Sequence, residues 1–154
     1  GLACRRNLLI DAGLLRGFVY DTVSGRRAGV ASTGSAQRGG IGGSPSAGVR
    51  ALQLQPGSKS QEEIFREIGD GFFIESLIGV HSGVNPISGD FSVGATGLLI
   101  RDGQLAEPIR EVTVASSLQK MLQDVIAIGS DVEWLPGTAA GQTIAINDIA
   151  LSGS

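Results

Sequence analysis

The polar side chains best placed for chemistry gather in one short segment, between Asn85 and Ser92. Asn85, Asp90 and Ser92 stand beside glycines there, so their side chains and free backbone amides could contact the backbone of a ligand. A structural interpretation competes with this one, because Asn-Pro and Gly-Asp pairs close turns in which the Asn or Asp side chain hydrogen-bonds its own backbone. Both interpretations stay open. The candidate residues of this segment are Asn85, Pro86, Gly89, Asp90, Phe91 and Ser92.

A second candidate segment lies in the glycine-rich stretch from Ser24 to Gly48, which has neither a helical nor a strand period and is predicted to be a long loop. Long loops in compact domains are commonly functional or mobile. This loop could contact a peptide or form an interface, or it could be a solvated, disordered segment. The P-loop pattern is excluded because the stretch contains no lysine. The candidate residues are Ser32, Thr33, Gly34 and Arg38.

Metal-binding and catalytic side chains are scarce. Cys4 is the only cysteine and His81 the only histidine, so one chain can form neither a disulfide framework nor a Cys/His zinc site. His81 has no Ser, Cys or Asp partner at a defined spacing, which favours an ordinary loop histidine over a general base. We therefore assign no catalytic residue, no metal ligand and no acid–base pair.

The composition predicts a single domain covering residues 1–154. The chain is 42% hydrophobic but only 5% aromatic, and it contains 24 glycines. A core of Leu, Ile, Val and Ala with many turns follows from this, which favours β-hairpins over a helical bundle. The first residue is Gly1 and the only methionine is Met121. We therefore expect a fragment or a processed product without its amino-terminal domain, and exposed apolar surface that promotes self-association.

The formal charge of −3 is unevenly distributed. Residues 1–50 contain seven arginines and two aspartates, whereas residues 51–154 contain five basic and thirteen acidic groups. Such asymmetry marks either a charged partner surface or a solvated face. No aromatic ladder accompanies the arginines, so nucleic acid is not an expected partner. No apolar run approaches the roughly 20 residues of a membrane helix and no leader opens the chain, so we expect no membrane partner and a cytoplasmic location.

Two helices and several strands should position the candidate residues. Ser60 and Glu63 form a capping box before a helix that ends at Gly69, and a second helix capped near Ser117 should extend through Ile126 to Gly129. The fold class is therefore α+β, a mostly antiparallel sheet or barrel-like domain with two amphipathic helices. The predicted strands are 7–10, 14–20, 49–54, 72–78 (buried), 91–100, 105–114, 131–134 and 142–149, with an Asp102-Gly103 hairpin turn.

The segment 83–92, Gly-Val-Asn-Pro-Ile-Ser-Gly-Asp-Phe-Ser, continues into Gly-Ala-Thr-Gly at 94–97. It closely resembles a segment of the TldD/PmbA family, which carries the historical label of DNA gyrase modulators. Residues 32–34, 100–104, 108–113 and 126–131 resemble four further family segments in the same order. The resemblance extends through most of the chain.

The resemblance implies two paralogous subunits, TldD and TldE/PmbA, which form a heterodimeric metallopeptidase acting on peptides or partly unfolded proteins such as microcin precursors. It also implies that the TldD subunit holds its metal with a His-Glu-x-x-x-His helix and a later cysteine. This chain has no His-Glu pair, and the region corresponding to the late cysteine, 138–142, reads Thr-Ala-Ala-Gly-Gln. Since a metal-bound water needs about three protein ligands, a metal-free TldE/PmbA-type subunit is expected.

Several functions remain open. The first is a binding subunit without cofactor that pairs with a TldD-like subunit, where zinc is expected, and helps to accept a peptide substrate. The second is a self-sufficient peptidase or a self-associating, metal-free homodimer with another activity. Direct action on DNA gyrase is a weaker alternative, which depends on the family label alone.

Overall fold

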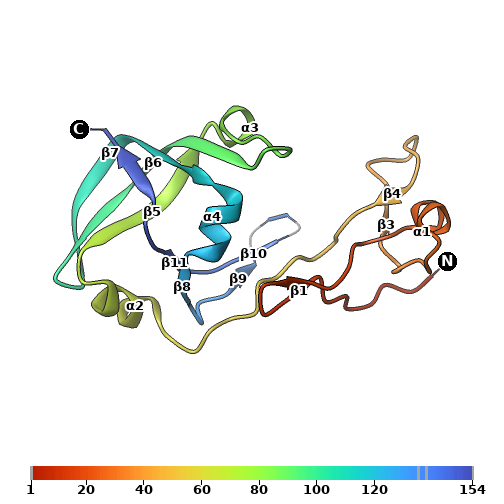
Figure 1. Cartoon of the computed structure of the whole chain (residues 1–154), viewed down its shortest axis with the longest axis horizontal. Coiled ribbons are helices and arrows are strands. Elements are labelled where there is room, and N and C mark those ends of the chain that lie inside the picture. The colour runs from red at the N-terminus through yellow and green to blue at the C-terminus, as the bar shows by residue number, and fades with distance from the viewer. Residues whose placement is uncertain (1, 135, 138, 154) are drawn as a thin grey trace. The chain divides into compact units, whose positions relative to one another are not determined.

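The computed structural model describes residues 2–134, 136–137 and 139–153, and its longest element pair is the hairpin of β6 (Asp90–Arg101) and β7 (Gln104–Ser117) (Figure 1). Its turn has positive φ at Asp102 (49°) and Gly103 (74°), as a type I′ turn requires. The predicted hairpin is therefore confirmed, with strands a few residues longer than predicted.

This hairpin forms the centre of a four-stranded antiparallel sheet, in the order β12-β7-β6-β5. The outer strands are β5 (Gly71–Ile78) and β12 (Ala150–Ser152). Residues alternate across the pleat, so every second side chain enters the core. The buried cluster on that face consists of Phe91, Val93, Ala95, Val112 and Val114.

The predicted strand at 72–78 is confirmed as β5, but its predicted burial is wrong. Phe72 and Ile78 are 49% and 60% exposed. The apolar run indicated a buried strand, whereas β5 is the last strand of its sheet and is covered by another strand on one edge alone. Its exposed apolar residues therefore form part of the molecular surface.

Helix α2 (Gln61–Ile68) is confirmed with the predicted cap. The Ser60 hydroxyl accepts from the Glu63 N–H, and the Glu63 carboxylate accepts from the Ser60 N–H. The helix buries Ile64 and Phe65, and the Phe65 ring meets Phe73 of β5 edge-to-face at 5.2 Å between centroids. Packing against the sheet therefore stabilises this short helix.

The second predicted helix is correct only in its first half. Helix α4 covers Leu118–Gln123, and the chain then forms β8 (Val125–Ile128), which pairs with β11 (Ile144–Ile146). The apolar stripe of the helix continues through Val125 and Ile126 in the sequence, but β-branched residues favour strands when a partner strand is available. The prediction of helix at 125–128 is therefore wrong.

The prediction of one long loop from Ser24 to Gly48 is also wrong. Helix α1 covers Thr22–Ala28, capped by the buried Asp21 side chain, and β3 (Ala36–Gln37) pairs with β4 (Ser46–Ala47). The predicted strand 49–54 is wrong as well, since Leu52 forms only an isolated bridge to Ala139. The capping box of α1, formed by Asp21 and Ser24, lies among glycines and arginines that are typical of a loop. The sequence pattern therefore did not predict a helix there.

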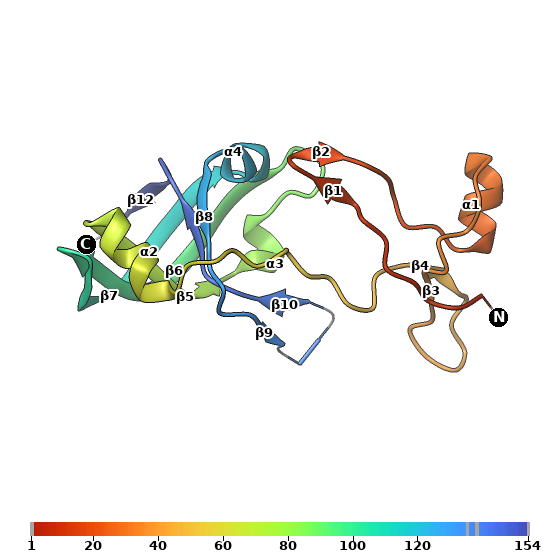
Figure 2. The same cartoon turned by 90° about the horizontal axis from the view of Figure 1, so that it is seen from below.

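The remaining elements are short. The predicted hairpin near the amino terminus is confirmed in reduced form, as β1 and β2 joined by Ala12 and Gly13, both with positive φ (Figure 2). A four-residue helix, α3, interrupts the predicted turn region 79–89. These elements are β1 (Ile10–Asp11), β2 (Leu14–Leu15), α3 (Val80–Gly83), β9 (Glu133–Trp134) and β10 (Ala140–Gly141).

The α+β class with a mostly antiparallel sheet is confirmed, although the described residues form four helices rather than two. The chain divides into two compact units. The basic unit, 1–54 and 134–141, contains seven arginines and two aspartates; the acidic unit, 55–133 and 142–154, has five basic and thirteen acidic residues. One domain over 1–154 stays a prediction. In the described part of the chain, no helix is long and apolar enough to cross a membrane.

Candidate functional site

The acidic unit has an open surface hollow of about 750 Å³ where β6 begins. Five of the predicted site residues line it, namely Asn85, Pro86, Asp90, Phe91 and Ser92. Its other lining residues are Ser82, Gly83, Val84 and Ser116. The sequence segment around Asn85 therefore contributes most of one wall of this hollow.

The loop that leads into β6 is held by an Asx turn. The Asn85 side-chain oxygen accepts from the N–H groups of Ile87 (2.9 Å) and Ser88 (3.2 Å), and the Asn85 N–H donates to the Asp90 carbonyl at 2.9 Å. The Ser88 hydroxyl donates to the Asp90 carboxylate at 2.6 Å. These contacts agree with the turn interpretation of Asn85 and Asp90, and they fix the backbone of the hollow's rim.

Gly89 permits this loop to pack against α4. It has φ of 83°, and a Cβ built there would lie 2.2 Å from the Gln119 side-chain oxygen. The Gln119 amide donates to the Ser88 carbonyl at 3.0 Å, and the Leu118 N–H donates to the Gly89 carbonyl at 2.7 Å. Gly89 is therefore buried between loop and helix rather than on the hollow's surface.

The floor of the hollow comes from a break in the edge of the sheet. Strand β5 ends opposite Gly94, the chain forms α3, and Val84 then bridges to Phe91. Gly83 passes so close to β6 that a Cβ on it would be 2.1 Å from the Ser92 carbonyl oxygen. Phe91 points into the core, whereas Ser92 is exposed on the opposite face. Ser92 is therefore free to contact a ligand, and Phe91 holds the strand in place.

The other candidate segment, 32–34, is bonded around Tyr20 in the basic unit. The Thr33 hydroxyl accepts from the Tyr20 N–H at 2.7 Å, and the Tyr20 carbonyl accepts from the Thr33 N–H at 3.0 Å and the Ser32 hydroxyl at 3.1 Å. A Cβ at Gly34 would lie 2.5 Å from the Ala3 carbonyl oxygen. Hydrogen bonds therefore hold the segment 32–34 against Tyr20. Contact of this segment with a peptide stays a prediction.

Arg38 is exposed, next to the short strand β3. It belongs to the basic unit together with Ser32, Thr33 and Gly34, whereas the hollow belongs to the acidic unit. The four candidates Ser32, Thr33, Gly34 and Arg38 do not line the hollow. The sequence missed Ser82 and Ser116, because neither lies in a recognisable motif and only the turn geometry brings them to the hollow.

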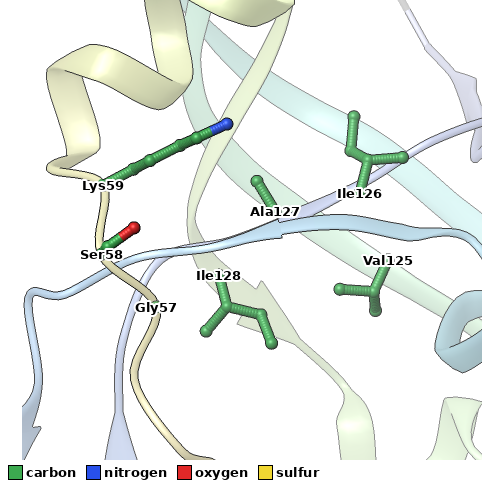
Figure 3. A pocket seen from close by; sticks show the side chains of 7 residues that line it. All are labelled: Gly57, Ser58, Lys59, Val125, Ile126, Ala127 and Ile128. Carbon is green, nitrogen blue, oxygen red and sulfur yellow. The ribbon is translucent and has the colours of Figure 1, made fainter. Parts of the chain in front are cut away.

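A smaller hollow of about 290 Å³ lies where residues 57–59 cross β8 (Figure 3). A Cβ at Gly57 would be 1.9 Å from the Ile128 carbonyl oxygen, and the Gly57 N–H donates to Gly129 at 3.1 Å. The Lys59 ammonium pairs with Glu67. Its other lining side chains are the Ser58 hydroxyl and the aliphatic side chains of residues 125–128, so this hollow reflects a close backbone crossing with few polar groups.

Hydrogen bonds tune the carboxylate of Asp131, close to that crossing. Partial burial raises the pKa of Asp131, but bonds from the Thr143 hydroxyl (2.7 Å) and N–H (3.1 Å) outweigh it and leave the pKa below the ordinary 3.8. The Gln61 amide in turn donates to the Thr143 hydroxyl at 2.7 Å. This network joins the start of α2 to the segment before β11 and has a structural role.

The described residues bring few metal-binding side chains together. Cys4 is exposed in the basic unit and His81 is exposed in the acidic unit. Among residues 2–134, 136–137 and 139–153, no three His, Cys, Asp or Glu side chains are grouped so that they could hold a metal ion. Thr138, in the region where the resemblance places a cysteine, lies outside the described residues, whereas Ala140–Gly141 form β10.

Comparisons with known proteins agree on one family. A family model described as the PmbA/TldA metallopeptidase C-terminal domain matches residues 1–153. Metalloprotease PmbA of Escherichia coli O157:H7 is 31% identical over 144 residues, which are 94% of this chain and 29% of that protein.

Solved structures show the same similarity. TldE from Thermococcus kodakarensis matches with a TM-score of 0.87 and 27% identity, over 99% of this chain and 35% of its own. A Thermotoga maritima protein described as a modulator of a DNA gyrase matches with a TM-score of 0.85 and 26% identity, over 98% of this chain and 34% of its own. The chain therefore spans about a third of the length of these relatives.

Proposed function

The chain belongs to the PmbA/TldD metallopeptidase family, and we propose that it is a metal-free TldE/PmbA-type subunit which completes the peptide-accepting site of a TldD-like metallopeptidase. In this complex the TldD-like partner supplies the zinc and the water that the zinc activates. The proposed substrates are peptides or partly unfolded proteins, such as microcin-type precursors, and the proposed location is the cytoplasm.

The shortage of metal-binding side chains carries this proposal. A catalytic zinc site needs about three protein ligands and one open position. The chain offers one histidine and one cysteine, in different compact units, and no cysteine in the segment 138–142. The similarity to TldE of Thermococcus kodakarensis over 99% of the chain supports the same assignment.

The large hollow offers the chain's own groups for binding an extended peptide. Its hydroxyls on Ser82, Ser92 and Ser116 donate and accept hydrogen bonds without charge, so they suit peptide backbones of varied sequence. The Asx turn holds the rim in one geometry before a ligand arrives, which reduces the entropy lost on binding. We assign binding and positioning to these residues and no step of bond cleavage.

Zinc analysis and peptide hydrolysis test the proposal. The full-length protein containing this chain is purified alone and together with a TldD-like partner, and each sample is assayed for bound metal and for cleavage of an unfolded peptide. We expect substoichiometric zinc in the protein alone, and cleavage only when the partner is present. The partner alone serves as the control and should cleave more slowly than the pair.

Four outcomes would count against the proposal. Stoichiometric zinc held by this protein, or peptide cleavage without the partner, would establish a self-sufficient peptidase. Equal cleavage by the partner with and without this protein would show that the chain does not complete the site. A metal-free protein that associates only with itself would favour the homodimeric alternative.

A further inference from the structure

The large hollow at the start of β6 has a single ionisable side chain among its described lining residues, the carboxylate of Asp90. The rest of the lining consists of three serines, an asparagine, a proline, a glycine and two apolar residues. All of these residues belong to the acidic unit. The sign of the charge that a ligand meets in this hollow is therefore set by Asp90.

The Asp90 carboxylate is oriented but not neutralised. Its Oδ2 accepts from the Ser88 hydroxyl at 2.6 Å, which fixes the carboxylate on the rim of the hollow. Within residues 2–134, 136–137 and 139–153, no lysine, arginine or histidine forms an ion pair with Asp90, and its side chain is exposed. A carboxylate has about four acceptor positions. Asp90 can therefore accept hydrogen bonds from a cationic group of a ligand.

Ser92 lies beside Asp90 in a way that suits an extended peptide. Both residues are exposed in β6, whereas Phe91 and Val93 are buried, so Asp90 and Ser92 project from the same face of the strand. Residues two apart on a strand are separated by about 7 Å, and an extended peptide has the same repeat. A peptide can therefore place a side chain or its amino terminus at Asp90 and its backbone at Ser92.

We propose that Asp90 determines a charge preference of the hollow, in which a cationic group of an extended peptide binds the Asp90 carboxylate. The group is a Lys or Arg side chain or the free amino terminus. Acidic side chains are disfavoured there, because like charges repel. The inference rests on the peptide-binding role proposed above and adds specificity to it. Asp90 has no part in bond cleavage.

The experiment is a competition between peptides for the assembled pair of full-length protein and TldD-like partner. Acetylated and amidated peptides of one sequence carry Lys, Gln or Glu at each position in turn, and mass spectrometry of the mixture gives ratios of kcat/KM. At one position we expect the order Lys, Gln, Glu, with roughly two- to fivefold between successive peptides, since the site is open to solvent. High salt should reduce these ratios. Peptides with a free amino terminus show whether that group is the preferred cation.

Asp90→Asn should bring the ratios close to one, because the amide keeps an acceptor for the Ser88 hydroxyl but carries no charge. Any preference that the Asn variant retains belongs to the partner. The matched control is Glu62→Gln, which removes an exposed negative charge from the same unit outside the hollow and should leave the ratios unchanged. Urea denaturation checks that the variants fold, and the salt dependence of the unmodified pair tests the charge preference without a variant.

The outcomes separate this inference from the function on which it rests. Partner-dependent cleavage without a charge preference, or with the same preference in Asp90→Asn, would overturn the inference and leave the proposed function standing. Absence of partner-dependent cleavage would count against the proposed function. In that case, fluorescence anisotropy of the labelled Lys and Gln peptides with the full-length protein alone tests Asp90 directly, and equal Kd values for the two peptides would overturn the inference.

Discussion

Gly83 lies against Ser92 so closely that a Cβ on Gly83 would stand 2.1 Å from the Ser92 carbonyl oxygen and 2.9 Å from a Val93 methyl group. This approach brings α3 onto β6 and forms the floor of the large hollow. This floor therefore depends on a glycine at position 83, because a Cβ there would collide with β6.

The first prediction concerns this close approach. Gly83→Ala forces α3 away from β6, because the nearest obstacle is backbone and not a flexible side-chain end. We expect a loss of about 1–3 kcal/mol in the free energy of unfolding, measured by urea denaturation. Gly17→Ala is the matched control, since a Cβ there meets nothing within 4 Å. Equal stability of the two variants would show that α3 is not held as described.

The second prediction concerns the Asx turn. Asn85→Ala removes the oxygen that accepts from Ile87 and Ser88, so it should lower the free energy of unfolding by about 1 kcal/mol. Asn85→Asp keeps an acceptor in the same place and should retain most of that stability. Urea denaturation of both variants checks this. If both lose the same stability, the amide nitrogen of Asn85 has a role that the turn does not explain.

The third prediction concerns acid stability through Asp21. Hydrogen bonds from the Ser24 hydroxyl and backbone N–H hold the pKa of Asp21 below its ordinary 3.8. The unfolded chain therefore binds the proton first as the pH falls. The stabilisation is fully present well above pH 3.8 and is lost as the pH falls through 3.8 and then through the lower folded pKa.

Substitution of either partner tests this linkage. Ser24→Ala should raise the pKa of Asp21 towards its ordinary value, as NMR titration of the side-chain carboxyl would report. Asp21→Asn should reduce the loss of helix α1 as the pH falls below 3.8, compared with the unmodified chain, at a cost in stability near neutral pH. An Asp21 pKa unaffected by Ser24→Ala would contradict the assigned cause.

The elements that the sequence predicted well contain their own local signals. The turn at Asp102-Gly103 needs positive φ at both positions, and the capping box at Ser60 and Glu63 bonds two orphan amides. Such signals act within a few residues and are visible in the chain. The β6–β7 hairpin and α2 were therefore predicted close to their observed bounds.

The errors arose where distant parts of the chain decide the structure. Val125 and Ile126 continue the apolar stripe of α4, yet pairing with β11, about 20 residues later, makes them a strand. The contacts of Thr33 with Tyr20 join residues 13 apart that have no shared motif. The hollow was predicted in part, because the segment of Asn85 was recognised while its other walls depend on tertiary packing.

The last prediction tests whether a peptide occupies the large hollow. Ser92 lines the hollow and is exposed on the face opposite the core, so Ser92→Phe should change the free energy of unfolding by no more than about 0.5 kcal/mol. The bulkier side chain should nevertheless obstruct an extended peptide and lower the kcat/KM of partner-dependent cleavage by at least roughly tenfold. Leu122→Phe is the control, because Leu122 is 70% exposed on α4 and does not line the hollow. Full activity of the Ser92 variant in the assembled pair would place the peptide elsewhere, whereas a loss with intact stability and intact pairing would locate it against the start of β6.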